Sequence, residues 1–218
     1  MTGYVQDEIT EDELERQRSL YGPFTDAVRE LVDATIRTEV DDAEVRAVQA
    51  EIEALTARLR VRQLPGPYGV RFSASGRGRP WGNPVVGLRN AAAPPVVVER
   101  DPAGRAWADF HLGAAFEGPP GLVHGGVASM ILDQLLGEAV GAGGKPGMTG
   151  TLTLRYRRGT PLGDLRAEAW IDRAEGIKTW ARGHLLDAEG VTVEAEGLFI
   201  LPRWARERMS AENPRYFE

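Results

Sequence analysis

The chain has 218 residues, no cysteine and a formal net charge of −6 at pH 7. The lack of cysteine excludes disulfides, thiolate zinc sites and a cysteine nucleophile. The acidic balance disfavours nucleic acid as a partner, because phosphates favour a basic surface. The polar N-terminus has no signal-peptide pattern, and no apolar run approaches the roughly 20 residues of a membrane span. We therefore expect a cytoplasmic, soluble protein without a membrane partner.

Residues 1–63 have the pattern of a helical extension. A polar segment over about 11–20 is followed by a second helical segment over about 24–38 that carries an apolar stripe. A third helix begins after a cap, Asp41 or Asp42. Its apolar residues recur at alternating steps of three and four: Val45, Val48, Ile52, Leu55 and Leu59. This seam over two heptads predicts packing, either on its own domain or on a partner subunit.

Residues 64–95 are rich in Gly and Pro and predict an irregular connector. Residues 96–203 form the next domain, and 204–218 form a charged tail. Within 96–203, two strand-like segments precede a helical stretch, Val127–Val140, that is apolar almost all round. Four further strand patterns follow, at about 149–158, 164–173, 177–187 and 192–201. Such a helix must be buried, so we expect an α+β fold in which a curved antiparallel sheet wraps it.

Asp133 stands in the middle of this apolar helix. An unpaired buried carboxylate costs several kcal/mol, so Asp133 must be paired, protonated or used in chemistry. A hydrogen bond to a backbone group or to a buried water is the structural alternative to a catalytic role.

The helix begins with His124-Gly125-Gly126. Glycines in a first helical turn leave unsatisfied backbone N–H groups uncovered at the positive end of the helix dipole. These groups can bind the oxyanion that forms when a carbonyl becomes tetrahedral. Gly125 and Asp133 lie about 12 Å apart along one helix, too far for one site. Two helices that lie antiparallel across a two-fold axis would bring them together, which predicts at least a dimer.

These residues resemble a known family. His124-Gly125-Gly126 with Asp133, the segment Met148–Leu152 and the segment Tyr156–Pro161 are similar to the hotdog-fold acyl-CoA thioesterases. The likeness is to the PaaI-type and thioesterase-superfamily-member branch of the 4-hydroxybenzoyl-CoA thioesterase superfamily. It covers about residues 96–202 and leaves residues 1–95 outside.

The resemblance implies a hotdog fold and the hydrolysis of acyl-CoA thioesters by a homodimer or a dimer of dimers. Asp133 would be the base or nucleophile and Gly125 the oxyanion donor, while His124 would orient the loop or the thioester. Thr149 would assist the carboxylate or the water; otherwise it is an ordinary hydroxyl at the start of a strand. No cofactor and no metal are implied, because the coenzyme A moiety belongs to the substrate.

The resemblance also implies a binding region for coenzyme A near Gly126, Arg155, Arg157 and Arg158. Guanidinium groups suit phosphate, although a solvated strand end explains the same arginines. The sequence departs from the family at Gly118, where an Asn or Gln often contacts the thioester or the water. A hydratase of the same fold is a further possibility, but its Asp-to-His motif on the helix is not evident. A non-catalytic acyl-CoA-binding or regulatory module is the alternative from another functional class.

Overall fold

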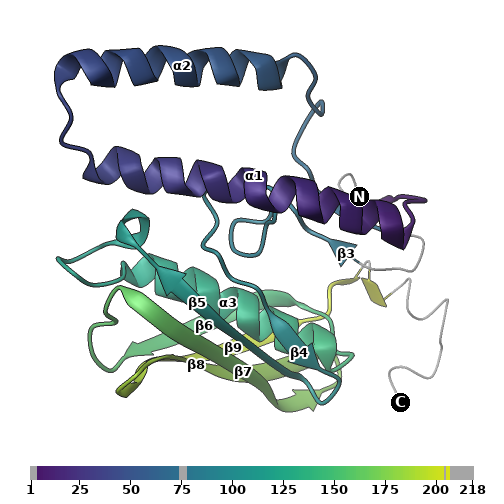
Figure 1. The fold of residues 1–218 in the computed structure, drawn as a ribbon. Coiled ribbons are helices and arrows are strands. Elements are labelled where there is room, and N and C mark those ends of the chain that lie inside the picture. Colours follow the sequence, from purple (N-terminus) through teal and green to yellow (C-terminus); the bar gives the residue numbers. More distant parts are fainter. Residues whose placement is uncertain (1–3, 74–77, 204, 207–218) are drawn as a thin grey trace. The chain divides into compact units, whose positions relative to one another are not determined.

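The protein is described from a computed structural model that covers residues 4–73, 78–203 and 205–206 (Figure 1). The chain divides into two compact units, Met1–Ala93 and Pro94–Glu218, and each is described by itself. Most of the expected charged tail, 204–218, lies outside the described residues.

The first unit contains two helices and a small sheet. The helices are α1 (Glu11–Arg37) and α2 (Asp42–Arg60). The strands β1 (Tyr4–Gln6), β2 (Val70–Phe72) and β3 (Gly78–Arg79) pair in this order, with β1 parallel and β3 antiparallel to β2. The connector predicted as irregular therefore carries two short strands. Strands of two or three residues are too short to show an alternating pattern in the sequence. Strand β2 also depends on pairing with β1, which lies more than 60 residues earlier in the chain.

Helix α1 runs without a break through Pro23, where the sequence pattern predicted two segments. Contacts on both sides of this proline hold the helix together. The Arg89 guanidinium stacks on the Tyr21 ring at 3.8 Å from the centroid. Arg29 donates hydrogen bonds to the carbonyl oxygens of Asn90 (3.1 Å) and Ala93 (3.2 Å). Tertiary packing thus offsets the backbone hydrogen bond that proline cannot make.

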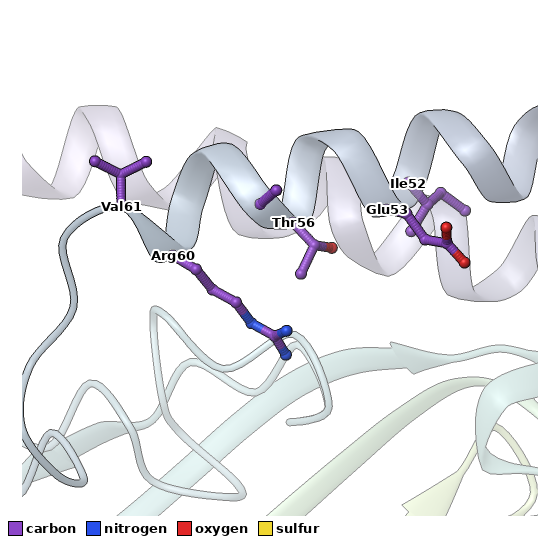
Figure 2. Close-up of a pocket in the computed structure, with 6 residues that line it drawn as sticks. Ile52, Glu53, Thr56, Arg60 and Val61 are labelled. Atoms are coloured by element: carbon purple, nitrogen blue, oxygen red, sulfur yellow. The ribbon is translucent and has the colours of Figure 1, made fainter.

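Helix α2 begins as expected, because the Asp41 carboxylate accepts hydrogen bonds from the N–H groups of Ala43 (2.9 Å) and Glu44 (3.0 Å). None of its residues is buried. Figure 2 shows Ile52 of the apolar seam beside an open hollow that is lined by the second half of α2. The other described residues of the first unit therefore do not bury its apolar seam, although packing on its own domain was one of the two predictions.

The second unit has one six-stranded antiparallel sheet with the order β4-β5-β7-β8-β9-β6. The strands are β4 (Glu99–Asp101), β5 (Arg105–Leu112), β6 (Met148–Tyr156), β7 (Gly163–Glu175), β8 (Lys178–Asp187) and β9 (Gly190–Ile200). The sheet curves around α3 (Gly125–Ala142), and a 3₁₀ turn, η1 (Ala114–Phe116), precedes that helix (Figure 1). This arrangement confirms the expected α+β hotdog fold.

Helix α3 packs against the sheet through one face. Its buried residues are Ala128, Ile131, Leu132, Leu135, Leu136, Ala139 and Val140. The backbone of the sheet approaches this face closely, since a Cβ atom on Gly197 would lie 3.2 Å from Leu136 Cδ1. A glycine at this point of β9 therefore lets the helix and the sheet meet.

The opposite face of α3 is only half-buried. Val127, Met130, Asp133 and Gly137 lie on it, which corrects the expectation of a helix buried all round. The neighbouring edge strand β6 is also mostly exposed. An apolar helix face and a sheet edge are thus left open side by side.

We expect Leu136→Ala to destabilise the second unit by about 2–5 kcal/mol, because it leaves a cavity between α3 and the sheet. Urea unfolding followed by tryptophan fluorescence measures the loss. Val97→Ala is the control, since Val97 is 77% exposed and its truncation should cost less than about 0.5 kcal/mol. Equal effects of the two changes would contradict this description of the core.

Candidate active site

His124 is the N-cap of α3, and its Nδ1 accepts a hydrogen bond from the Gly126 N–H at 3.0 Å. In a neutral ring this fixes the proton on Nε2. The backbone before the helix is held by two further bonds, from His124 N–H to the Phe116 carbonyl (2.9 Å) and from Val123 N–H to the Thr160 carbonyl (2.8 Å). The capping bond engages the Gly126 N–H within the chain itself.

The Gly126 N–H is engaged by His124, so the N–H of Gly125 is the one at the start of the helix that remains open to a ligand oxygen. Within the part of the chain that the structure describes, this N–H donates no hydrogen bond. The carbonyl oxygen of Gly125 accepts a hydrogen bond of 2.9 Å from the Tyr156 hydroxyl at the end of β6. Tyr156 was not predicted as a site residue, because a tyrosine at the exposed end of a strand carries no signal of its own.

Gly118 packs directly against the start of the helix. A Cβ atom at this position would lie 2.7 Å from the Cα atom of His124, which is closer than atoms can approach. The amide side chain that the resembling family often carries here cannot fit without a shift of the loop. Glycine at position 118, where the sequence departs from the family pattern, therefore lets this loop pack against the start of the helix.

Asp133 lies two helical turns further along α3 and is half-buried rather than enclosed. Its Oδ1 accepts a hydrogen bond of 2.9 Å from Thr149 Oγ1, at the start of β6. The carboxylate is thus held by a side chain of the adjacent edge strand. This bond satisfies one carboxylate oxygen and leaves the second for another partner.

The predicted site residues around α3 form two groups, one at the start of the helix and one at Asp133. His124, Gly125 and Gly126 lie together at the start of α3, and Asp133 with Thr149 forms the second group. The groups are separated by about 12 Å of helix. The structure of a single chain does not join them.

Three arginines lie at the end of β6 or just after it, and they differ in their contacts. Arg157 pairs with Glu194 at 2.6 Å. Arg158 forms a two-pronged ion pair with Asp187, in which Nη1 lies 2.7 Å from Oδ2. Arg155 makes no ion pair within the described residues. The first two arginines are therefore largely neutralised by their own chain, whereas Arg155 has no such ion pair among the described residues.

Among the described residues, no group of three or more His, Asp or Glu side chains could hold a metal ion. In that same part of the chain, no helix is long and apolar enough to cross a membrane.

No family model matches the chain. The crystal structure of a thioesterase superfamily protein is 36% identical to it, with a TM-score of 0.74. That similarity covers 83% of this chain and 94% of the other. The chain therefore belongs to the thioesterase superfamily. The likeness also extends into the first unit, because the second unit alone is too short for this coverage.

Two further proteins are similar over smaller parts. The acyl-coenzyme A thioesterase THEM4 of Bos taurus is 32% identical over 94 residues, which make up 42% of this chain and 38% of that protein. The chain thus spans about two fifths of the length of this curated relative. A phenylacetic acid degradation-related protein from Ralstonia eutropha is 25% identical, with a TM-score of 0.45, over 49% of this chain and 85% of the other.

Hydrogen bonds from Arg158 hold the pKa of the Asp187 carboxyl below its ordinary value. We expect Arg158→Gln to raise this pKa, as measured by an NMR titration of the carboxyl carbon. Because the folded-state pKa is depressed, the ion pair adds stability above the unfolded pKa of aspartate. That stability is lost as the pH falls through the folded value. Arg155→Gln is the control and should leave Asp187 unchanged; an unshifted Asp187 in Arg158→Gln would contradict the assignment.

Proposed function

We propose that this protein hydrolyses acyl-CoA thioesters to the free acid and coenzyme A, and that residues 96–203 carry the activity. The observation that carries the proposal is the hydrogen bond from Thr149 to Asp133, on the same half-open helix face as the free N–H of Gly125. A positioned carboxylate and an oxyanion donor are the two groups that thioester hydrolysis requires. Membership of the thioesterase superfamily and the likeness to a curated acyl-CoA thioesterase support it.

In this proposal Asp133 acts on the thioester carbon, either directly as a nucleophile or through water as a base. As a base, its free oxygen accepts a proton from water while the oxygen of that water bonds to the carbonyl carbon. The carbonyl oxygen becomes an oxyanion that the Gly125 N–H stabilises. The C–S bond then breaks, and the sulfur of coenzyme A leaves and takes up a proton. Thr149 keeps the carboxylate oriented throughout.

The two groups of the site come together only if two chains share it. Strand β6 pairs with β9 on one side and is the edge of the sheet on the other. An unpaired strand edge is a ready template for another strand. Antiparallel pairing of β6 with β6 of a second chain would place the Thr149 end of one strand beside the Tyr156 end of the other. Asp133 of one chain would then face Gly125 of its partner.

The nucleotide end of coenzyme A carries phosphates, and Arg155 is the residue we assign to them. It lies on β6 close to Tyr156, and its guanidinium is exposed. Arg157 and Arg158 are held in ion pairs with Glu194 and Asp187, and they position the turn after β6. Gly126 contributes backbone that a ligand can approach closely, because it carries no side chain.

Binding of acyl-CoA without turnover is the second candidate. The close packing of Gly118 against His124 favours it, since no amide side chain can assist the water at that position. The two candidates differ in one measurement, which is the release of free thiol from a panel of acyl-CoA substrates of different chain lengths. Binding without thiol release from any of them would overturn the enzymatic proposal.

We expect Asp133→Ala and Asp133→Asn to lower kcat about 10²–10⁴-fold, because both remove the reacting carboxylate. The readout is thiol release under substrate saturation. Thr149→Ala should lower kcat less, and Thr149→Ser should retain most activity because it keeps the hydroxyl. Full activity in Asp133→Ala would show that another residue performs the reaction.

Gly125→Pro removes the proposed oxyanion donor. Proline is favoured at the first position of a helix, and the extended His124 backbone (ψ 130°) is compatible with a following proline. We expect kcat to fall about 10²–10³-fold. Gly125→Ala is the matched control, since it adds a side chain but keeps the N–H. A similar loss in both variants would indicate a steric effect.

Mixing two inactive variants tests whether the site is shared. After unfolding and refolding together, Asp133→Asn and Gly125→Pro chains should form mixed dimers with one intact site in two. Random 1:1 assortment then gives about a quarter of the wild-type activity. No recovery of activity in a mixture that demonstrably contains mixed dimers would place both groups within one chain.

A further inference from the structure

The first two residues of α3 are glycines, Gly125 and Gly126. Glycine has more backbone freedom than any other residue and is a poor helix former, and helix ends fray. The N–H of Gly125, which is the proposed oxyanion donor, therefore lies where the helix itself restrains the backbone least. A donor with a fixed direction requires contacts from other groups of the chain.

The peptide unit between Gly125 and Gly126 is held at both ends by side chains. Its N–H donates a hydrogen bond to His124 Nδ1 (3.0 Å), and its carbonyl oxygen accepts one from the Tyr156 hydroxyl (2.9 Å). A peptide unit is planar, and its N–H and C=O point in opposite directions. The bonds to these two separate side chains therefore keep this unit from rotating.

The N–H of Gly125 belongs to the preceding peptide unit. The carbonyl oxygen of that unit, which is the His124 carbonyl, accepts hydrogen bonds from the N–H groups of Val127 (2.9 Å) and Ala128 (3.3 Å). At the other side of the unit, the Gly125 N–H donates no hydrogen bond among the described residues. The two peptide units share the Gly125 Cα atom, so the fixed orientation of the second unit restricts the direction of this N–H.

Tyr156 is itself fixed at the end of β6. It pairs with Val193 of β9, and the N–H of the next residue, Arg157, donates a hydrogen bond to the Thr192 carbonyl at 2.8 Å. The Tyr156 ring lies against the start of α3, since a Cβ atom on Gly125 would be 3.3 Å from the hydroxyl oxygen and 3.4 Å from Cε1. Tyr156 is 53% exposed, so this contact does not come from burial in the core. The sheet thus restrains the start of the helix through this side chain.

We propose that Tyr156 is a positioning residue, whose hydroxyl fixes the direction of the Gly125 N–H toward the carbonyl oxygen of the thioester. The proposal rests on the proposed hydrolysis. An oxyanion donor stabilises charge that develops in the transition state, and a misplacement of about 1 Å can cost about 10²-fold in rate. The hydroxyl bonds to the neighbouring peptide unit and not to the one that carries this N–H. It therefore acts on the direction of the N–H rather than on its acidity.

Tyr156→Phe in the full-length protein tests the proposal, because it removes the hydroxyl and keeps the ring. We expect kcat for thiol release to fall about 10-fold. KM should change less than about two-fold, since an interaction made in the transition state affects kcat and kcat/KM equally. The Tm should stay within about 4 °C of the wild type, because the lost hydrogen bond is a single exposed one. A lower Tm with unchanged kcat would mean a purely structural role and would overturn the proposal.

Two variant backgrounds show whether the hydroxyl acts through the Gly125 N–H. In Gly125→Pro, which lacks this donor, adding Tyr156→Phe should cause no further fall in kcat. In Thr149→Ala, the matched control that keeps the donor, adding Tyr156→Phe should cause the same fall of about 10-fold as in the wild type. Equal falls in the two backgrounds would show that the hydroxyl acts on another group, which contradicts the proposal.

A measurement without substrate separates this proposal from the proposed hydrolysis. In ¹⁵N relaxation experiments, Tyr156→Phe should lower the amide order parameter of Gly125 from about 0.85 towards about 0.6 and leave that of Asp133 unchanged. An unchanged order parameter at Gly125 would overturn the positioning role even in an active enzyme. A wild type that releases no thiol from any acyl-CoA would overturn the hydrolysis instead, and the order parameter would still decide whether Tyr156 fixes this amide.

Discussion

The packing of α3 against the curved sheet is the constraint on which the candidate site depends. One face of the helix supplies the core of the second unit, and this leaves the opposite face, with Asp133, half-open. The same packing fixes the start of the helix, where His124 caps the Gly126 N–H and leaves that of Gly125 free. A single buried helix thus carries both chemical groups but holds them about 12 Å apart.

The edge strand β6 connects these two groups. Thr149 at its beginning binds Asp133, and Tyr156 at its end binds the carbonyl of Gly125. The edge strand therefore contacts both groups of the proposed site. In the proposed reaction, a site shared by two chains is the simplest way for Asp133 and Gly125 to act on one thioester. Such a site would also cover the largely apolar face of α3 that a single chain leaves half-open.

Much of this could be predicted from the sequence. The helical period of Val127–Val140 and the alternating patterns after it define the hotdog fold, and the spacing of His124 and Asp133 indicates the site. Three features had no local signal. Tyr156 reaches Gly125 only through the fold, and Gly118 is required by a close approach to His124. Arg157 and Arg158 have their charges paired by residues from distant strands.

The first unit shows the same limit of sequence reasoning. The pattern predicts a break near Pro23, but contacts of Tyr21 and Arg29 with residues far along the chain maintain α1. The seam of α2 was recognised from its spacing, whereas its exposure could be seen only in the structure. The similarity to a solved superfamily member over 83% of the chain places part of this unit within the shared architecture.

The central claim is that each catalytic site combines Asp133 of one chain with Gly125 of another. The most direct measurement is a crystal structure of the Asp133→Asn variant with a non-hydrolysable acyl-CoA analogue. The account predicts a carbonyl oxygen about 3 Å from the Gly125 N atom of one chain, with Thr149 and position 133 of the second chain beside the carbonyl carbon. An analogue whose carbonyl contacts Gly125 and position 133 of the same chain, or neither of them, would contradict it.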